Sequence, residues 1–245
     1  MANVVCVFGA PGSGATTFSL GLALRYAKKK NNVALLLPDI CSPQIPALFP
    51  QNTKKKEDKD VRSLGKIFQS AYITDTDIMK QFVTVPKTPR FVMLGYAFGE
   101  NEFTYPTPSE SDIYSFYQKL SEMVDVIIVD CSHSVNNLFS KIALSRADGI
   151  IKCGDCSFKS VSYFASTIPT MSNNKDAIEL TVYCDVKESD NVNEVSDIVG
   201  VPDYEIPYFK DLEKMGDEGE LLISPYPVKY IKTVDKIIEE MIFIG

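Results

Sequence analysis

The sequence predicts an α/β fold with a doubly wound, mostly parallel sheet flanked by helices, and three observations support this prediction. Short apolar runs, such as those at 4–8 and 33–37, alternate with helix-like segments. A strand buried in a parallel sheet reads as an uninterrupted apolar run, and strands that alternate with helices favour right-handed crossovers. The length of 245 residues suits a single domain over 1–245, since no repeat or low-complexity linker divides the chain.

The expected elements follow one another in a regular order. The first unit is a strand at 4–8, a helix at 16–30 after a glycine-rich turn, and a strand at 33–37. A surface loop is expected at 42–60, where Pro, Gln and Lys are frequent. The later segments are helices at 61–71 and 75–82, strands at 83–85 and 90–94, a loop at 99–109, a helix that Ser109 or Ser111 caps and that ends near 123, strands at 125–130, 149–152, 179–184 and 203–206 with helices between them, and a final helix at 228–243.

Composition and charge disfavour several classes of protein. Hydrophobic residues make up 45% of the chain and charged residues 23%, which is ordinary globular usage. The sequence contains neither an apolar stretch of about 18 residues nor a signal peptide, so we expect a cytoplasmic protein with its six cysteines reduced. The net charge of −7 disfavours nucleic acid as a partner, because non-specific binding needs an excess of Lys and Arg. The final helix carries balanced charges, so it is expected to pack on the sheet, and any membrane contact is expected to be indirect.

A glycine-rich loop, GAPGSGATT at 9–17, joins the first strand to the first helix. Its spacing, G-x-x-x-x-G-x-T between a strand and a helix, is typical of a phosphate-binding loop, in which backbone N–H groups and the helix N-terminus attract the anion. We therefore predict ATP or ADP with Mg²⁺ as the ligand, and Thr16 stands where a hydroxyl would bind the metal. A glycine-rich structural turn without a ligand is the alternative. The predicted nucleotide-binding residues of the loop are Gly9, Gly12, Ser13, Gly14, Ala15, Thr16 and Thr17.

The loop contains no lysine. Ala15 occupies the position of the lysine that normally reaches the β- and γ-phosphates. Loss of a contact of this kind often raises the reaction barrier by about 3–4 kcal/mol. We therefore expect weak hydrolysis or none.

The loop and the segments that follow it resemble the MinD/ParA family of P-loop ATPases, whose deviant Walker A motif carries two lysines. Ala10 matches the family's signature lysine, and Ala15 matches its ordinary P-loop lysine. VALLLPDICSPQIP is similar to the family's second-strand motif and places Asp39 on its second aspartate, with Leu37 on the first. VDVIIVDCSHS resembles the Walker B strand and places Asp130 on its acidic residue. ADGIIKCGDCSFKSV and VPDYEIPYFKDLEKMGDEG resemble the next strand and the late segment beside the base.

The resemblance implies roles for individual residues. Asp39 would be catalytic by orienting a water molecule, Asp130 would support Mg²⁺ together with Thr16, and Pro207 and Tyr208 would flank the base. Either carboxylate has an alternative role as the anchor of a loop or helix cap. Family members close as ATP-bridged homodimers and act with protein partners of larger assemblies. The lysine-poor loop also resembles that of the TadZ/CpaE branch, which positions pilus or secretion machinery rather than DNA.

Three further features leave alternatives open. Cys153 and Cys156 form a CxxC pattern, which suits a redox pair, half of a metal site or a strand-end turn. His133, three residues after Asp130, faces either the γ-phosphate or solvent. Lys152 or Lys159 are candidates to replace the missing loop lysine.

The sequence favours one function and leaves two others. The first is a degenerate MinD/ParA-like protein that binds nucleotide weakly and acts as a dimeric positioning or scaffold factor, with a pilus, secretion or conjugation apparatus as the possible assembly. The second is an active ParA-type ATPase for DNA partition, which the acidic charge and the missing lysines disfavour. The third is a nucleotide-free protein-interaction module.

Overall fold

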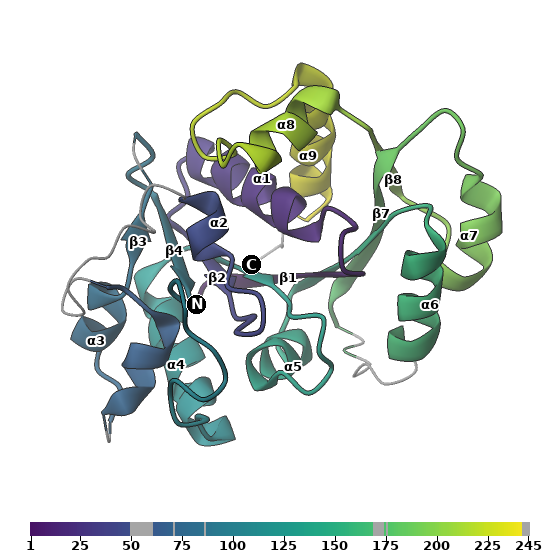
Figure 1. The fold of residues 1–245 in the computed structure, drawn as a ribbon. Helices are drawn as coiled ribbons and strands as arrows, with labels where there is room; N and C mark the ends of the chain where they lie inside the picture. Colours follow the sequence, from purple (N-terminus) through teal and green to yellow (C-terminus); the bar gives the residue numbers. More distant parts are fainter. Residues whose placement is uncertain (50–60, 71, 86, 169–173, 175, 242–245) are drawn as a thin grey trace.

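A computed structural model describes residues 1–49, 61–70, 72–85, 87–168, 174 and 176–241 (Figure 1). The described strands are β1 (Asn3–Gly9), β2 (Val33–Leu37), β3 (Val83–Thr84), β4 (Phe91–Gly95), β5 (Val126–Asp130), β6 (Gly149–Gly154), β7 (Ile178–Val186) and β8 (Tyr204–Pro207). They form one eight-stranded sheet in the order β3-β4-β2-β5-β1-β6-β7-β8. Every pairing is parallel except that of the edge strand β3 with β4. The predicted α/β fold is confirmed.

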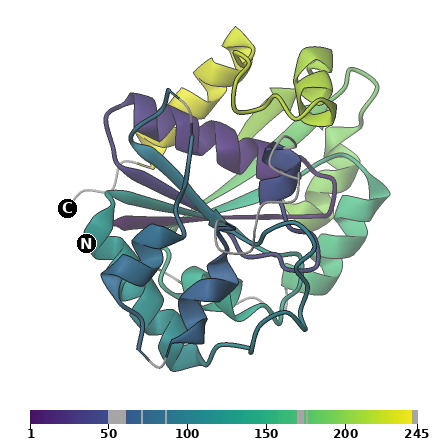
Figure 2. The ribbon, with the colours of Figure 1, turned by 60° about the vertical axis from the view of Figure 1, so that its left-hand side comes forward.

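Helices cover both faces of this sheet. The described helices are α1 (Ala15–Lys28), α2 (Ile45–Leu48), the 3₁₀ helix η3 (Leu64–Gln69), α3 (Asp75–Lys80), α4 (Glu110–Met123), α5 (Leu138–Ser145), α6 (Phe158–Thr167), α7 (Val192–Val199), α8 (Lys210–Asp217) and α9 (Val228–Glu240). Figures 1 and 2 show α1, α8 and α9 on one face and α3 to α7 on the other. No helix in the described ranges combines the length and the apolar character needed to span a bilayer.

Successive side chains of a strand pack alternately into two hydrophobic cores, one on each face of the sheet. Val5 and Val7 of β1 point into the core beneath α1 and α9, whereas Cys6 and Phe8 point into the core beneath α4 to α7. All four are buried. Because successive side chains of a strand face opposite ways, a strand covered on both faces must be apolar throughout. This requirement explains the uninterrupted apolar runs in the sequence.

The final helix packs on the sheet, as expected. Val234 and Ile237 of α9 are fully buried in the core beneath α1. Arg25 of α1 holds Asp235 of α9 through two hydrogen bonds, from Nε at 2.9 Å and from Nη2 at 2.7 Å. The helix ends at Glu240, and residues 242–243 of the predicted range lie outside the described residues.

The segment between β2 and α4 differs from the prediction in two places. The expected loop at 42–60 contains the short helix α2, whose Ile45 and Leu48 are buried against the sheet; residues 50–60 lie outside the described residues. The expected helix at 61–71 is a shorter 3₁₀ helix, η3. Ring atoms of Tyr105 come within 2.1 Å of the point where a Cβ on Gly65 would stand, so only glycine fits there. Tertiary packing therefore overrides local propensity in this segment.

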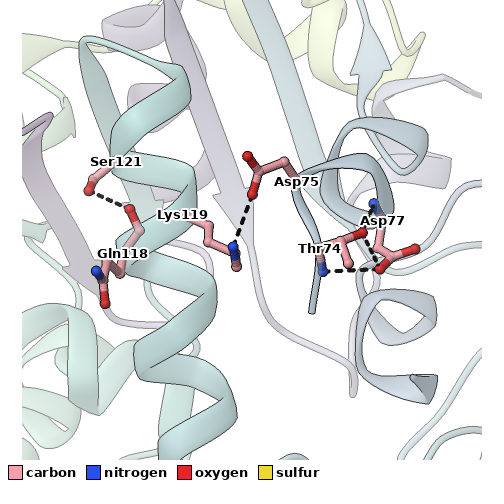
Figure 3. A network of polar contacts seen from close by, with 6 residues as sticks. All are labelled: Thr74, Asp75, Asp77, Gln118, Lys119 and Ser121. Atoms are coloured by element: carbon pink, nitrogen blue, oxygen red, sulfur yellow. Dashed lines mark hydrogen bonds and ion pairs between the residues drawn. The ribbon is translucent and has the colours of Figure 1, made fainter. Parts of the chain in front are cut away.

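Side-chain caps fix the starts of α3 and α4, and Figure 3 shows the cap of α3 together with the ion pair that joins the two helices. Thr74 caps α3 through a capping box with Asp77, and the N–H of Asp77 donates to Thr74 Oγ1 at 3.2 Å. Lys119 of α4 donates to Asp75 of α3 at 3.1 Å, which joins the two helices. Ser109, rather than Ser111, caps α4 through a second capping box with Asp112.

Candidate functional site

The loop between β1 and α1 is held tightly against strand β6. A Cβ on Gly9 would stand 2.2 Å from the carbonyl oxygen of Cys153, so no other residue fits at this position. The buried Ser13 hydroxyl donates to the same carbonyl oxygen at 2.9 Å. Gly12 and Gly14 have φ angles of +88° and +81°, in the region that favours glycine. The loop therefore has one defined path from the strand into the helix.

The N-terminus of α1, next to this loop, has backbone N–H groups without a hydrogen-bond acceptor inside the helix. The first intrahelical bond runs from Phe18 N to Gly14 O at 2.9 Å. The N–H groups of Ala15, Thr16 and Thr17 precede that bond and have no intrahelical acceptor. No side chain caps the helix, and no acidic residue lies in its first turn. This arrangement favours an anion at the helix N-terminus.

Asp130, at the carboxyl end of β5, lies directly beside Thr16. The Thr16 hydroxyl donates to its Oδ2 at 2.7 Å, and the Ser19 hydroxyl donates to its Oδ1 at 3.1 Å. Burial raises the pKa of Asp130 from 3.8 to about 6, and the Asp39 charge adds to the rise, whereas the two hydroxyls and His133 oppose it. A hydroxyl and a carboxylate are oxygen ligands of the kind that Mg²⁺ prefers, so this pair fits the metal predicted from the sequence.

A cleft of about 580 Å³ lies beside the loop. One wall is the loop, including Gly12, Gly14, Thr16 and Thr17. The rest of the lining includes residues from the ends of β7 and β8 and from α8 and α9, namely Cys184, Asp185, Ile206, Tyr208, Leu212, Glu213, Gly216 and Tyr230. The cleft thus combines the anion-attracting loop with apolar and aromatic side chains.

The two residues predicted to flank a base are placed differently. Tyr208 lines the cleft, its hydroxyl donates to Glu213 at 2.6 Å, and the Lys187 ammonium lies 5.2 Å from its ring centroid. Pro207 ends β8 and is not among the residues that line the cleft. Asp185, which the sequence analysis missed, lines the cleft beside Gly14 and has a positive φ of 56°. Only the strand register brings Asp185 to the cleft, so no local motif identifies it.

Asp39 anchors a turn in this structure. Its Oδ1 accepts hydrogen bonds from the N–H groups of Cys41 at 2.9 Å and Ser42 at 3.3 Å. Asp39 itself is not among the lining residues, although Ser42 and Gln44 from the same turn are. The geometry matches the loop-anchoring alternative, and the catalytic role of Asp39 stays a prediction.

The positions that lack lysine are filled by small buried side chains. Ala10 is 1% exposed and Ala15 is 6% exposed, and both line the cleft. Lys152, one of the two proposed replacements, lies on β6 and pairs with Glu179 at 3.5 Å. The loop therefore offers backbone dipoles and hydroxyls but no formal charge.

His133 lies at the mouth of the loop. Its Nδ1 is 2.9 Å from the carbonyl oxygen of Gly9, and its ring lines the cleft. Because a carbonyl oxygen only accepts, Nδ1 carries the proton in this contact and Nε2 is left for another partner. A role for His133 at the γ-phosphate stays a prediction.

The CxxC pattern does not bring its two cysteines together as a pair. Cys153 is buried, and its Sγ lies 3.2 Å from the Sγ of Cys184 on β7, which the sequence analysis did not single out. The hydrogen bond with Cys153 and burial raise the pKa of the Cys184 thiol well above its ordinary value, so the reactive thiolate is disfavoured. Within the described part of the chain, no three His, Cys, Asp or Glu side chains are grouped to hold a metal ion. The arrangement matches a strand-end turn.

Comparison with known proteins shows the fold. No family model and no curated protein matches the sequence. Among solved structures, a ParA family ATPase from Chlorobium tepidum has a TM-score of 0.72 at 12% identity, over 100% of this chain and 99% of that chain. MinD from Pyrococcus horikoshii, complexed with Mg-ADP, has a TM-score of 0.70 at 13% identity, over 97% and 96%. A chain from the MinC:MinD cell division complex of Aquifex aeolicus has a TM-score of 0.67 at 18% identity, over 99% and 98%. The chain therefore has the fold of the MinD/ParA P-loop ATPases.

We expect Asp130→Asn to raise the free energy of unfolding of the nucleotide-free protein at pH 7. The folded-state pKa of Asp130, about 6, lies above the ordinary value of 3.8, so the folded state holds the proton more tightly than the unfolded state. The stability that this proton contributes is complete below pH 3.8 and is lost as the pH rises through about 6. The asparagine amide stays neutral and still accepts a hydrogen bond, so the gain should be about 1–3 kcal/mol at pH 7 and absent near pH 4.

Urea unfolding of both proteins across this pH range measures the difference. Asp112→Asn is the control with the opposite sign, because hydrogen bonds from Ser109 lower the pKa of Asp112. Its stability should fall relative to the natural protein above that lowered pKa. An Asp130→Asn protein no more stable than the natural one at pH 7 would contradict the assignment of a burial-raised pKa.

Proposed function

We propose that this chain is a cytoplasmic, MinD/ParA-like positioning or scaffold protein that binds ATP or ADP with Mg²⁺ and hydrolyses it slowly or not at all. The observation that carries the proposal is the loop with free N–H groups, held beside the Thr16–Asp130 pair at the end of a cleft of about 580 Å³. We further propose that residues 1–245 act as one domain, since a single sheet joins strands from both halves of the chain.

The phosphate end of the cleft supports nucleotide binding. The N–H groups of Ala15, Thr16 and Thr17 present donors to an anion, and Gly9, Gly12, Ser13 and Gly14 shape the loop around it. Thr16 and Asp130 would hold Mg²⁺, which neutralises phosphate charge when bound. The MinD structure with Mg-ADP has the same fold, which agrees with this ligand class.

The aromatic and apolar part of the cleft lining supports the binding of a nucleobase. Tyr208 offers an aromatic ring, and Ile206 and Leu212 offer apolar surface in the same lining. A nucleobase stacks on surfaces of this kind whatever its identity. In this proposal Pro207 supports the backbone beside Tyr208 rather than touching the base itself, since it does not line the cleft.

Slow hydrolysis follows from the missing charges. Removal of one preorganised contact to a developing negative charge commonly slows a reaction about 10²–10³-fold. Both lysine positions are alanine, Ala10 and Ala15, and the Asp39 carboxylate is held by a local turn. Binding without efficient turnover suits a protein that holds a position better than one that cycles rapidly.

Exposed apolar side chains at the edge of the sheet that holds the loop support the proposal of dimerisation and protein partners. Phe98, Val135 and Phe158 follow the carboxyl ends of β4, β5 and β6, and are 70%, 50% and 90% exposed. Parallel strands end at the same edge of a sheet, so these side chains share the edge that holds the loop. We propose a homodimer across this edge, with protein partners in a larger assembly, of which a TadZ/CpaE-like pilus, secretion or conjugation apparatus is one candidate. The net charge of −7 disfavours DNA as the partner.

Calorimetric titration tests nucleotide binding. The natural protein should bind ATP and ADP in the presence of Mg²⁺, and Thr16→Ala should weaken Mg-ATP binding about tenfold or more, because it removes a metal ligand and a hydrogen bond to Asp130. Thr233→Ala removes an exposed hydroxyl on α9 and should leave binding unchanged. No binding by the natural protein would refute the proposal and favour a nucleotide-free interaction module. Rapid turnover would refute the scaffold form and favour an active ATPase.

A lysine restored at position 15 should strengthen the site. Ala15→Lys places an ammonium at the start of α1, where it reaches bound phosphates, so ATP affinity should rise about tenfold or more and turnover should become measurable. Ala15→Met adds similar length without charge and should give neither effect. Equal behaviour of the two variants in titration and phosphate-release assays would show that the lost lysine charge is not what limits this site.

A further inference from the structure

A lysine of helix α6 lies beside Gly12 of the loop. Lys159 is the second residue of α6, and its Nζ lies 3.8 Å from the point where a Cβ on Gly12 would stand. Apart from Gly12 and its chain neighbours, no other described atom comes within 4 Å of that point. Gly12 lines the cleft, so the ammonium lies at the edge of the space where a phosphate would bind.

The start of α6 is fixed relative to the loop through strand β6. The fully buried Ser160 accepts a hydrogen bond from Asp155 N at 3.2 Å, just after β6 ends at Gly154. Ser157 caps α6 by accepting from Ser160 N. The same strand supplies the Cys153 carbonyl that holds the loop. The backbones of Lys159 and Gly12 are therefore both held in place by the end of strand β6.

Of the two candidate lysines, only Lys152 forms an ion pair within the described part of the chain. Lys152 pairs with Glu179, and its side chain is 26% exposed. Lys159 is exposed, and the described part of the chain offers it no ion pair. A lysine carries its charge on a flexible four-carbon stem, so an ammonium at this distance can follow a ligand that enters the cleft.

The acidic side chains of the cleft would repel a polyphosphate unless a cation offsets their charge. The residues that line it include Asp185 and Glu213 but no lysine or arginine among those described. The Asp185 carboxylate comes within 3.7 Å of the point where a Cβ on Gly14 would stand, on the loop itself. A polyphosphate that enters the cleft meets this negative charge, and backbone dipoles alone must offset it unless a cation is added.

We propose that Lys159 binds the terminal phosphates of the nucleotide and supplies from α6 the positive charge that the loop itself lacks. This inference rests on the proposed nucleotide-binding function and names the residue that makes it possible without a loop lysine. Gly12 lies ahead of the helix N-terminus, so the ammonium reaches the outer phosphates rather than the sugar. Lys159 thereby distinguishes ATP and ADP from AMP.

Titration of ATP and AMP with Mg²⁺ into the natural protein, Lys159→Gln, Lys159→Arg and Lys152→Gln tests the inference. Lys159→Gln should weaken ATP binding about tenfold and leave AMP binding within about twofold, because one charge-assisted contact to the outer phosphates is lost. Lys159→Arg should keep most of the ATP affinity, and Lys152→Gln should match the natural protein. Thermal unfolding of the nucleotide-free proteins checks that all four are equally folded.

The outcomes separate this inference from the proposed function. ATP binding by Lys159→Gln equal to that of the natural protein overturns the inference and leaves the proposed function standing. An equal loss for ATP and AMP, or a similar loss in Lys152→Gln, also overturns it, because either result indicates a general charge effect. Failure of the natural protein to bind any nucleotide overturns both.

Discussion

The attachment of the loop to strand β6 is the constraint on which the rest of the site depends. Gly9 passes so close to the Cys153 carbonyl that a side chain cannot fit, and Ser13 donates a hydrogen bond to the same oxygen. These two contacts set the direction in which α1 leaves the sheet. That direction in turn places Thr16 against Asp130 at the end of β5 and points the free N–H groups into the cleft. Because β5, β1 and β6 are neighbours within the sheet, the site is built on its central strands.

The site has the backbone shape of a phosphate-binding loop, but it lacks the positive charge that usually strengthens phosphate binding. The loop has no lysine, and the cleft lining includes Asp185 and Glu213. An anion would then be held by dipoles, a hydroxyl, a metal and a cation from outside the loop, each of which acts at short range. Under the proposed function, such a site would favour reversible binding over rapid catalysis. If Lys159 holds the outer phosphates as proposed, occupancy of the cleft would also involve α6, whose first turn carries the exposed Phe158 beside Lys159.

The sequence predicted what depends on local pattern and missed what depends on register. Apolar runs located the central strands, and glycine spacing located the loop, because burial on both faces and a tight turn each demand particular residues. Asp185 and the Cys153–Cys184 contact escaped notice, since they arise from the alignment of β6, β7 and the loop. Lys152 and Lys159 were equivalent in the sequence; only the structure gives one a partner on β7 and places the other above Gly12. The segment at 61–71 was predicted as a longer helix than η3, because its contact with Tyr105 has no local signal.

Hydrogen exchange at the backbone amides of the loop tests the central claim most directly. If the N–H groups of residues 12–17 cradle a phosphate, addition of ATP with Mg²⁺ should slow their exchange markedly and should also slow exchange at the start of α6. Helix α4, none of whose residues line the cleft, should be unaffected. Unchanged exchange throughout residues 12–17 at saturating nucleotide would contradict the account and reduce the loop to a structural turn.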